Sequence, residues 1–131
     1  LSMISTKKIK EVFEEKASSH TATIFATDQS PSNAKRAYWT TFLNQDTAVL
    51  FGTEIYAKRY DSPVLYGHMR KVKRGHFTVE FTVLHDDPNS TAEGEITELQ
   101  NKKLEEAILE APQYWLWSHK RWKRKRSELD E

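Results

Sequence analysis

The sequence predicts one α/β domain over residues 1–131, a layered mixed sheet flanked by helices. Two observations predict this class. Stretches with apolar residues at helical spacing alternate with short β-branched and aromatic runs, in the order α-β-β-α-β-β-α-α. No internal repeat or low-complexity linker divides the chain, and 131 residues are enough to bury a core.

The composition narrows the chemistry. The chain has no cysteine, which excludes disulfides and thiolate metal sites, and no apolar run approaches the roughly 20 residues that span a bilayer. The net charge of +1 hides a local cluster, because six cations lie between Lys120 and Arg126. An anionic partner would therefore meet a basic patch rather than a basic protein.

In the first third of the chain, a helix is expected over residues 5–18, whose inner face carries Ile9, Val12, Phe13 and Ala17. Residues 21–27 are apolar on both faces, which is typical of a strand covered on both sides. The polar loop 28–33 follows. Open α/β sheets place their sites at such strand ends, although an ordinary Asx turn would have the same composition.

A second strand is expected over residues 37–43, and a helix begins at Asp46 or Thr47 and ends near Tyr60. Residues 64–72 and 76–84 predict a hairpin joined near Gly75. Its second strand alternates, and the apolar set is expected to face inward: Phe77, Val79, Phe81 and Val83.

Ser90-x-x-Glu93 has the form of a capping box and predicts a helix to about Glu110. Pro112 breaks that helix and suits the first turn of another. On this last helix, Trp115, His119 and Trp122 would share one face.

The residues themselves do not declare an active site. None of the five histidines has the spacing of a metal pair or the flanks of a catalytic triad, and the four glycines form no phosphate loop. We therefore expect no metal and no cofactor. The C-terminal tail, residues 112–126, is different, because three tryptophans lie among its cations. It suits a membrane surface or, alternatively, a nucleic acid, and Trp115 also suits an aromatic cap on the core.

The segment Pro112-Gln113-Tyr114-Trp115-Leu116-Trp117-Ser118-His119-Lys120-Arg121-Trp122-Lys123 resembles the terminal motif of the bacterial lipid A biosynthesis acyltransferases. These are lauroyl and myristoyl transferases of the lysophospholipid acyltransferase superfamily. Further similarities follow in the family's order: the strand-ending Asp28-Gln29-Ser30-Pro31, the aromatic strand 38–43, and Ser62-Pro63-Val64-Leu65 after a helix. The resemblance covers residues 20–126 and implies the C-terminal half of the glycerolipid acyltransferase fold.

One departure from the family concerns catalysis. The family's signature is a His followed five positions later by Asp or Glu, whereas the residues at that distance here are Phe25, Lys73, Phe81, Ser90 and Arg124. The resemblance places this dyad upstream of the matched part. Since the chain begins with Leu1 rather than Met, we expect a C-terminal portion of a longer enzyme that is inactive alone and pairs with an N-terminal half.

The resemblance implies acyl transfer from acyl carrier protein to a hydroxyl of a lipid A precursor or related glycolipid, at the cytoplasmic face of the bacterial inner membrane. Two roles are expected for this part of the chain. The substrate and phosphate contacts would come from Asp28, Gln29, Ser30, His119, Arg121, Lys123 and Arg124. The membrane-facing residues would be Trp115, Trp117 and Trp122. A small nucleic-acid-binding module is the alternative, and under the acyltransferase interpretation no nucleic acid is expected.

Overall fold

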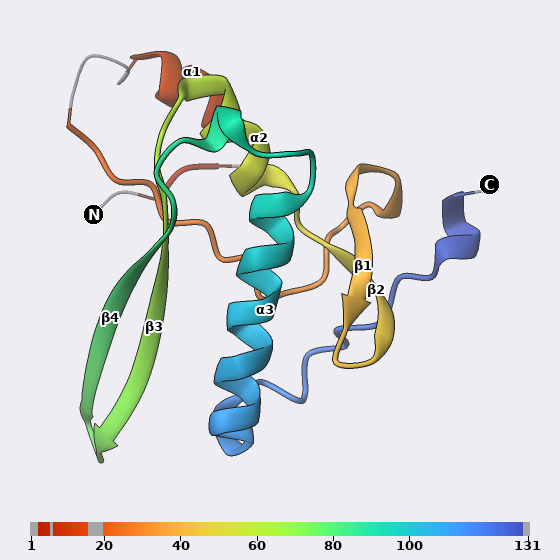
Figure 1. Cartoon of the computed structure of the whole chain (residues 1–131). Helices are drawn as coiled ribbons and strands as arrows, with labels where there is room; N and C mark the ends of the chain where they lie inside the picture. Colours follow the sequence, from red (N-terminus) through yellow and green to blue (C-terminus); the bar gives the residue numbers. More distant parts are fainter. Residues whose placement is uncertain (1–2, 6, 16–19, 130–131) are drawn as a thin grey trace.

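The computed structural model describes residues 3–5, 7–15 and 20–129, and it is a mixed α/β structure (Figure 1). The α/β class is therefore confirmed. The main elements are α1 (Ile9–Glu15), β1 (Tyr38–Phe42), β2 (Gln45–Val49), α2 (Gly52–Tyr60), β3 (Val64–Lys73), β4 (His76–His85) and α3 (Glu95–Glu110). Short 3-10 turns cover Ala34–Arg36, Pro88–Ser90, Pro112–Tyr114 and Arg126–Leu129.

The strands of the described residues form two separate antiparallel pairs, β1–β2 and β3–β4, in place of one mixed sheet. The helix predicted to run from Asp46 or Thr47 to about Tyr60 is confirmed for Gly52–Tyr60, but its predicted start is wrong, since Gln45–Val49 is a strand. Its physical reason is the turn before it. Leu43 and Asn44 both have positive φ, 48° and 60°, which is the backbone of the tight turns that close β-hairpins.

The strand predicted over residues 21–27 is also wrong, because the structure assigns no strand there. A strand that is apolar on both faces needs pairing partners and two covering layers. Here β1 pairs with β2 and β3 with β4, and Ile24 is 78% exposed. Phe25 packs instead in an aromatic cluster with Phe13 of α1, whose ring centroid lies 5.0 Å from that of Tyr56 in α2. The helix predicted over 5–18 is confirmed for Ile9–Glu15, whereas Thr6 and residues 16–18 lie outside the described residues.

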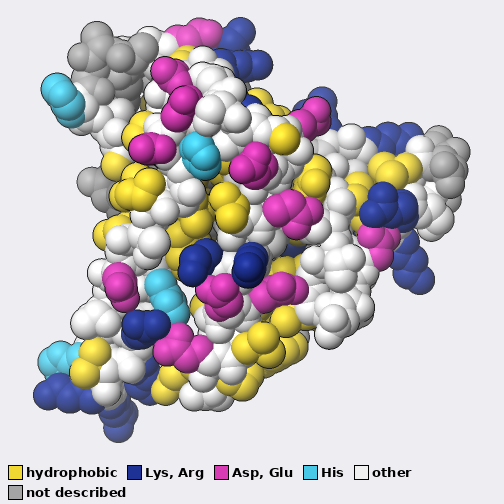
Figure 2. All heavy atoms as spheres, viewed as in Figure 1, with side chains coloured by type: hydrophobic (Ala, Val, Ile, Leu, Met, Phe, Trp, Pro, Cys, Tyr) yellow, Lys and Arg dark blue, Asp and Glu magenta, His cyan; other side chains and the backbone are white. Residues whose placement is uncertain are grey.

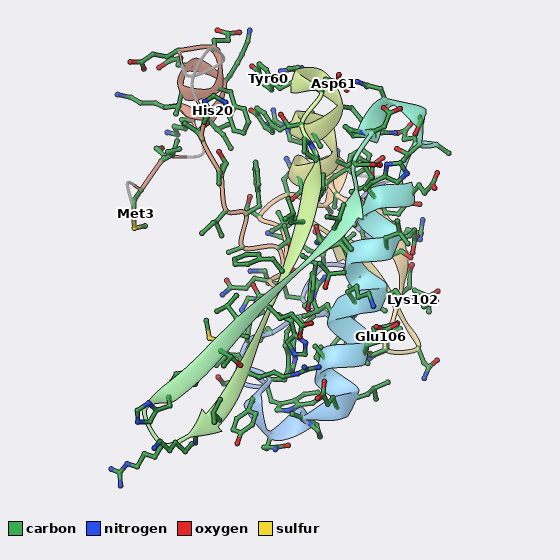
Figure 3. All side chains as sticks on the ribbon, turned by 60° about the vertical axis from the view of Figure 1, so that its left-hand side comes forward. Met3, His20, Tyr60, Asp61, Lys102 and Glu106 are labelled. Atoms are coloured by element: carbon green, nitrogen blue, oxygen red, sulfur yellow. The ribbon has the colours of Figure 1, made fainter. Side chains whose placement is uncertain are left out.

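The β3–β4 hairpin is confirmed, with Gly75 at φ 76° in its turn, but its predicted orientation is wrong. Phe77, Val79, Phe81 and Val83 are 48–67% exposed. It is the polar face of the hairpin that lies against α3, where Arg70 contacts Glu110 at 3.2 Å. Figure 3 shows the hairpin passing α3 diagonally and extending beyond it to its turn.

The compact part of the core lies where α2 and α3 meet the first residues of the β3–β4 hairpin. Ala57, Val64 and Ile96 are buried together, and Leu84 packs against them. Helix α3 begins at Glu95 rather than at Ser90, so the capping box is not the device that starts it. Its first N–H groups are satisfied from outside, because the buried Glu54 carboxylate accepts from Gly94 N at 2.7 Å and from Thr97 N at 3.0 Å.

The tail does not form the predicted helix after Pro112. A 3-10 turn ends at Tyr114, and residues 115–125 follow an irregular path across β1–β2. Hydrogen bonds to distant backbone outweigh the helix propensity of the tail. The Arg121 and Arg124 side chains donate to carbonyl groups that lie 73 and 93 residues away in sequence. Among the described residues, the helices are too short and too polar to cross a membrane.

Candidate functional site

The structure brings the polar loop 28–33 and the tail together, although they lie about 90 residues apart in sequence. Ser30 donates its backbone N–H to His119 Nε2 at 3.0 Å. Arg124 donates from Nε to the Pro31 carbonyl at 3.3 Å and also from Nη2 to the Ser32 carbonyl. Two segments that the sequence singled out separately therefore form one site.

Arg121 is the centre of this site, and it is 2% exposed. Its Nη1 donates to the Ala48 carbonyl at 2.8 Å, and its guanidinium carbon lies 5.4 Å from the centroid of the Phe42 ring. Nε and Nη2 are buried and have no hydrogen-bond partner within the described part of the chain. These two atoms form the edge of a guanidinium that binds a carboxylate or phosphate in a bidentate manner.

The electrostatics show that this charge is poorly compensated. Burial lowers the pKa of Arg121, and the nearby Asp28 carboxylate partly opposes that shift. Burial also raises the pKa of the Tyr66 hydroxyl, and Asp28 adds to that effect. Asp28 therefore acts on both groups, but no salt bridge to Arg121 is formed among the described residues.

A second buried polar atom of the site also lacks a partner. The Ser30 hydroxyl Oγ is buried and accepts or donates no hydrogen bond within the described ranges. Unpaired buried polar groups are costly, and they concentrate where a ligand or another conformation satisfies them. Ser30 Oγ and the Nε/Nη2 edge of Arg121 therefore leave hydrogen-bonding capacity unused at this site.

The remaining predicted site residues occupy different surroundings. Gln29 and Lys123 are exposed, and Arg124 is also paired with Glu128 at 3.2 Å. Trp115 is half-buried beside Phe42, with a centroid distance of 6.5 Å. The three tryptophans do not form one outward face, because Trp122 bonds to Thr47 Oγ1 at 2.9 Å while Trp117 is 56% exposed.

Sequence reasoning missed the contacts that fasten the end of the tail. Arg126 makes a bidentate pair with Asp46, at 2.6 and 2.9 Å, and its guanidinium lies 5.0 Å from the centroid of the Trp39 ring. The sequence predicts Asp46 at the start of a helix, whereas the structure places it in β2, where it pairs with Arg126. The density of cations after Lys120 was the available signal, but it does not show which ones have partners inside the molecule.

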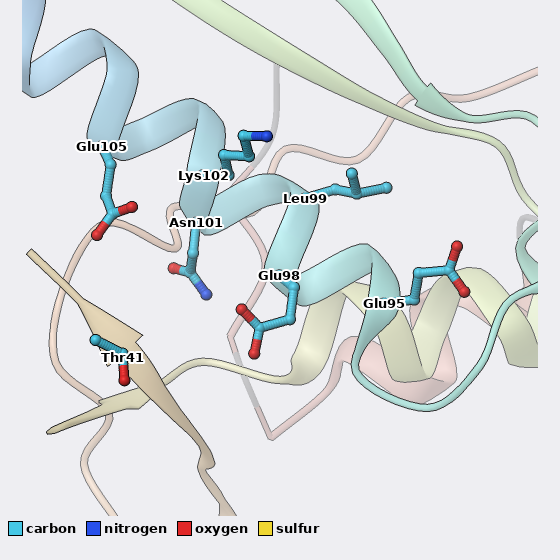
Figure 4. Close-up of a pocket in the computed structure, with 7 residues that line it drawn as sticks. All are labelled: Thr41, Glu95, Glu98, Leu99, Asn101, Lys102 and Glu105. Atoms are coloured by element: carbon cyan, nitrogen blue, oxygen red, sulfur yellow. The ribbon is translucent and has the colours of Figure 1, made fainter. Parts of the chain in front are cut away.

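A separate cleft of about 430 Å³ lies between α3 and β1 (Figure 4). It is lined by Thr41, Glu95, Glu98, Leu99, Asn101, Lys102 and Glu105. Its carboxylates would repel a phosphorylated lipid, so this cleft does not suit the expected acceptor. In the ranges that the structure describes, no group of His, Asp or Glu side chains could hold a metal ion.

Comparison with known proteins bears directly on this site. The sequence model of the family described as bacterial lipid A biosynthesis acyltransferase matches residues 1–124, which include both the loop and the tail up to Arg124. No curated protein and no solved structure matches the chain at a significant level.

Proposed function

Because the chain belongs to the family of bacterial lipid A biosynthesis acyltransferases, we propose that it is part of an enzyme that acylates a lipid A precursor or a related glycolipid. The acyl donor in this proposal is the thioester of acyl carrier protein. The observation that relates the proposal to particular residues is the contact of loop 28–33 with the tail, where the buried Arg121 has no hydrogen-bond partner for Nε and Nη2 within the described residues.

The chemical step of this proposal needs a base that the chain does not supply. The acceptor hydroxyl oxygen attacks the thioester carbonyl, the C–S bond breaks, and the proton of the hydroxyl passes to a histidine oriented by a carboxylate. None of the five histidines is followed by Asp or Glu at the fifth position. We therefore assign the base to a separate N-terminal half of the enzyme and expect the 131-residue chain to be inactive alone.

The loop and the tail would supply substrate electrostatics. In this role, the Nε/Nη2 edge of Arg121 binds a substrate phosphate or carboxylate. Asp28, Gln29 and Ser30 border that position from the loop, and His119 holds the loop through the Ser30 N–H. Arg124 donates to the loop carbonyls, and the exposed Lys123 would meet a second phosphate.

The proposed location is the cytoplasmic face of the inner membrane. Trp117 and Leu116 are 56% and 54% exposed, and exposed Lys120 and Lys123 lie close to them in sequence. Amphipathic aromatic rings and cations together suit the headgroup region of an anionic membrane. Trp115 and Trp122, by contrast, would support this surface from within, since both are half-buried.

The nucleic-acid alternative loses support from the same contacts. Nonspecific binding of single strands uses several exposed aromatic faces along a basic groove. Here the Trp122 ring is tied to Thr47 and the Trp115 ring lies beside Phe42.

The experiment that tests the proposal is transfer of radiolabelled lauroyl or myristoyl groups from acyl carrier protein to a lipid A precursor. We expect no product from the chain alone, and product when a polypeptide carrying the family's His-x4-Asp/Glu segment is added. In that mixture, Arg121→Met should lower the rate well below that of the matched Arg59→Met control, whose guanidinium lies on the exposed side of α2. Turnover by the chain alone, or equal rates for the two variants, would contradict the assignment.

A further inference from the structure

The outer face of the β3–β4 hairpin, defined here as Leu65, Met69, Phe77, Val79, Phe81 and Val83, is apolar and uncovered. Each of these side chains is 48–67% exposed. Their strand register makes the face continuous, because Leu65 lies opposite Val83 and Met69 lies opposite Val79. Soluble proteins rarely leave an apolar surface of this kind without a partner.

The opposite, polar face of the hairpin is the one directed toward the rest of the domain. Arg70 contacts Glu80 at 3.3 Å and Glu110 of α3 at 3.2 Å, so the polar side of the hairpin is the side that lies against the domain. The polar face is thus directed toward α3, although the Arg70 and Glu80 side chains stay 50% and 69% exposed, and the apolar face is directed away from α3. This is the reverse of the usual burial of a sheet and indicates an apolar partner outside the domain.

The charged residues around the outer face indicate the sign of the charge on the partner's surface. Lys71, Lys73 and Arg74 are exposed at the turn, and Figure 2 shows basic side chains gathered at that end of the hairpin. The single acid between residues 64 and 85 is Glu80, which points to the polar face and is paired with Arg70. A partner with an apolar interior and an anionic surface complements this arrangement.

The turn region of the hairpin contacts the first residues of the tail. Lys71 Nζ lies 5.5 Å from the centroid of the Tyr114 ring, which joins the turn region of the hairpin to the end of α3. Tyr114, Leu116 and Trp117 are 54–59% exposed. Tyr and Trp are enriched at the level of lipid headgroups, so these exposed side chains of the tail have a preference for the same environment as the outer face.

We propose that the outer face of the β3–β4 hairpin docks on an anionic lipid bilayer. The apolar side chains enter the boundary of the acyl region, and Lys71, Lys73 and Arg74 contact lipid phosphates. This inference rests on the membrane location proposed above and adds to it, because the hairpin rather than the tail alone becomes the main lipid-binding element.

The experiment is cosedimentation of the full 131-residue chain with vesicles of phosphatidylglycerol and phosphatidylcholine, and with vesicles of phosphatidylcholine alone. The test variant is Phe77→Thr/Val79→Thr/Val83→Thr, since threonine keeps the β propensity of the strand. Phe81 is left unchanged because its ring covers Gly67, where a Cβ would lie 3.1 Å from the ring. The matched control is Thr78→Val/Thr82→Val, on the opposite face of the same strand.

We expect binding to the anionic vesicles to fall about tenfold or more in the triple variant and to stay unchanged in the control. Replacing Lys73 and Arg74 with Gln should weaken it roughly fivefold for each charge, with little effect on the neutral vesicles. Unfolding midpoints of all variants show whether the hairpin is intact. Since the vesicles contain no acyl donor, a failure of acyl transfer leaves this result unaffected.

Two outcomes would overturn the inference. Equal vesicle binding by the triple variant and the native chain would show that the outer face does not meet lipid. Self-association of the native chain that is lost in the triple variant, with no vesicle binding by either, would assign the face to a second copy instead.

Discussion

Trp122 donates its indole N–H to the Thr47 hydroxyl at 2.9 Å, across 75 residues of sequence. Thr47 is 1% exposed and in turn donates to the Gln45 carbonyl at 2.8 Å, so the bond ends in the backbone of the β1–β2 hairpin. Arg121, one residue earlier, is bonded to the next residue of that strand, Ala48. Two consecutive residues of the tail are therefore bonded to two consecutive residues of β2.

Trp122→Phe should lower the free energy of unfolding by about 1 kcal/mol, because the ring volume is largely kept while the donor to Thr47 is lost. Trp117 provides the matched comparison. Its indole donates to the Pro112 carbonyl within the tail, at 2.7 Å, and its ring is half exposed. Trp117→Ser should therefore leave urea unfolding nearly unchanged and weaken binding to anionic vesicles. The reverse pattern in the two assays would show that Trp122, not Trp117, meets the lipid.

Arg121→Met should leave stability unchanged or raise it, although Arg121 is among the most buried side chains of the domain. Two effects compete. The lost bond to the Ala48 carbonyl costs about 1–3 kcal/mol, whereas burial of a guanidinium without a paired acid costs several kcal/mol. The Met side chain keeps the packing on Phe42.

Two measurements on Arg121→Met test whether this arginine serves function at the expense of stability: the free energy of unfolding in urea and the rate in the transfer assay described above. Loss of more than about 3 kcal/mol would show instead that Arg121 is a structural anchor. Arg121→Lys is a useful companion, because lysine keeps the charge but not the planar edge formed by Nε and Nη2.

The sequence allowed local features to be predicted where one segment determines them. The β3–β4 hairpin follows from alternation and from Gly75, and α3 follows from its apolar spacing with only its first turn misplaced. The strand predicted at 21–27 and the predicted start of the helix at Asp46 or Thr47 are wrong, because both depend on which segments lie alongside. Strand β2 exists because the turn at Leu43 and Asn44 brings residues 45–49 back alongside β1, and residues 21–27 join neither of the two strand pairs.

The site was predictable in its parts but not in its arrangement. The family resemblance singled out the loop at Asp28 and the tail at Arg121, and nothing in either segment alone shows that they meet. His119 has no metal or triad spacing in sequence, and its partner, the Ser30 N–H, becomes visible only in three dimensions. Likewise, a count of cations cannot separate Arg121, which is buried, from Lys123, which is exposed.

Glu54→Gln should destabilise the domain by about 2–4 kcal/mol. The Glu54 carboxylate is 1% exposed, accepts from the backbone of Gly94 and Thr97 and from the Thr97 hydroxyl, and lies 3.3 Å from Lys58 Nζ. The glutamine amide would direct an N–H group at backbone donors that start α3. The matched control is Glu11→Gln on the exposed face of α1, which should change stability by less than about 0.5 kcal/mol. If the two substitutions lower the free energy of unfolding equally in urea, Glu54 does not stabilise the start of α3.

The same carboxylate predicts how stability depends on pH. Burial alone would raise the pKa of Glu54, but the hydrogen bonds from Thr97 and Gly94, together with Lys58, outweigh it and hold the pKa below its ordinary value of 4.5. The folded chain therefore binds fewer protons at this site than the unfolded chain. The resulting stability is fully present above pH 4.5 and is lost as the pH falls through the lower folded pKa.

Unfolding midpoints measured from pH 7 down to about pH 3 should thus fall more steeply for the native chain than for Glu54→Gln, which has no proton to bind at this position. The two curves should converge at the acidic end, because the native carboxyl is then protonated and its advantage is gone. Asp46→Asn is an informative control, since the pKa of Asp46 is also lowered, mainly by its hydrogen bond to Arg126, but the pair is exposed to solvent. Parallel curves for the native chain and Glu54→Gln would show that Glu54 does not titrate with a lowered pKa.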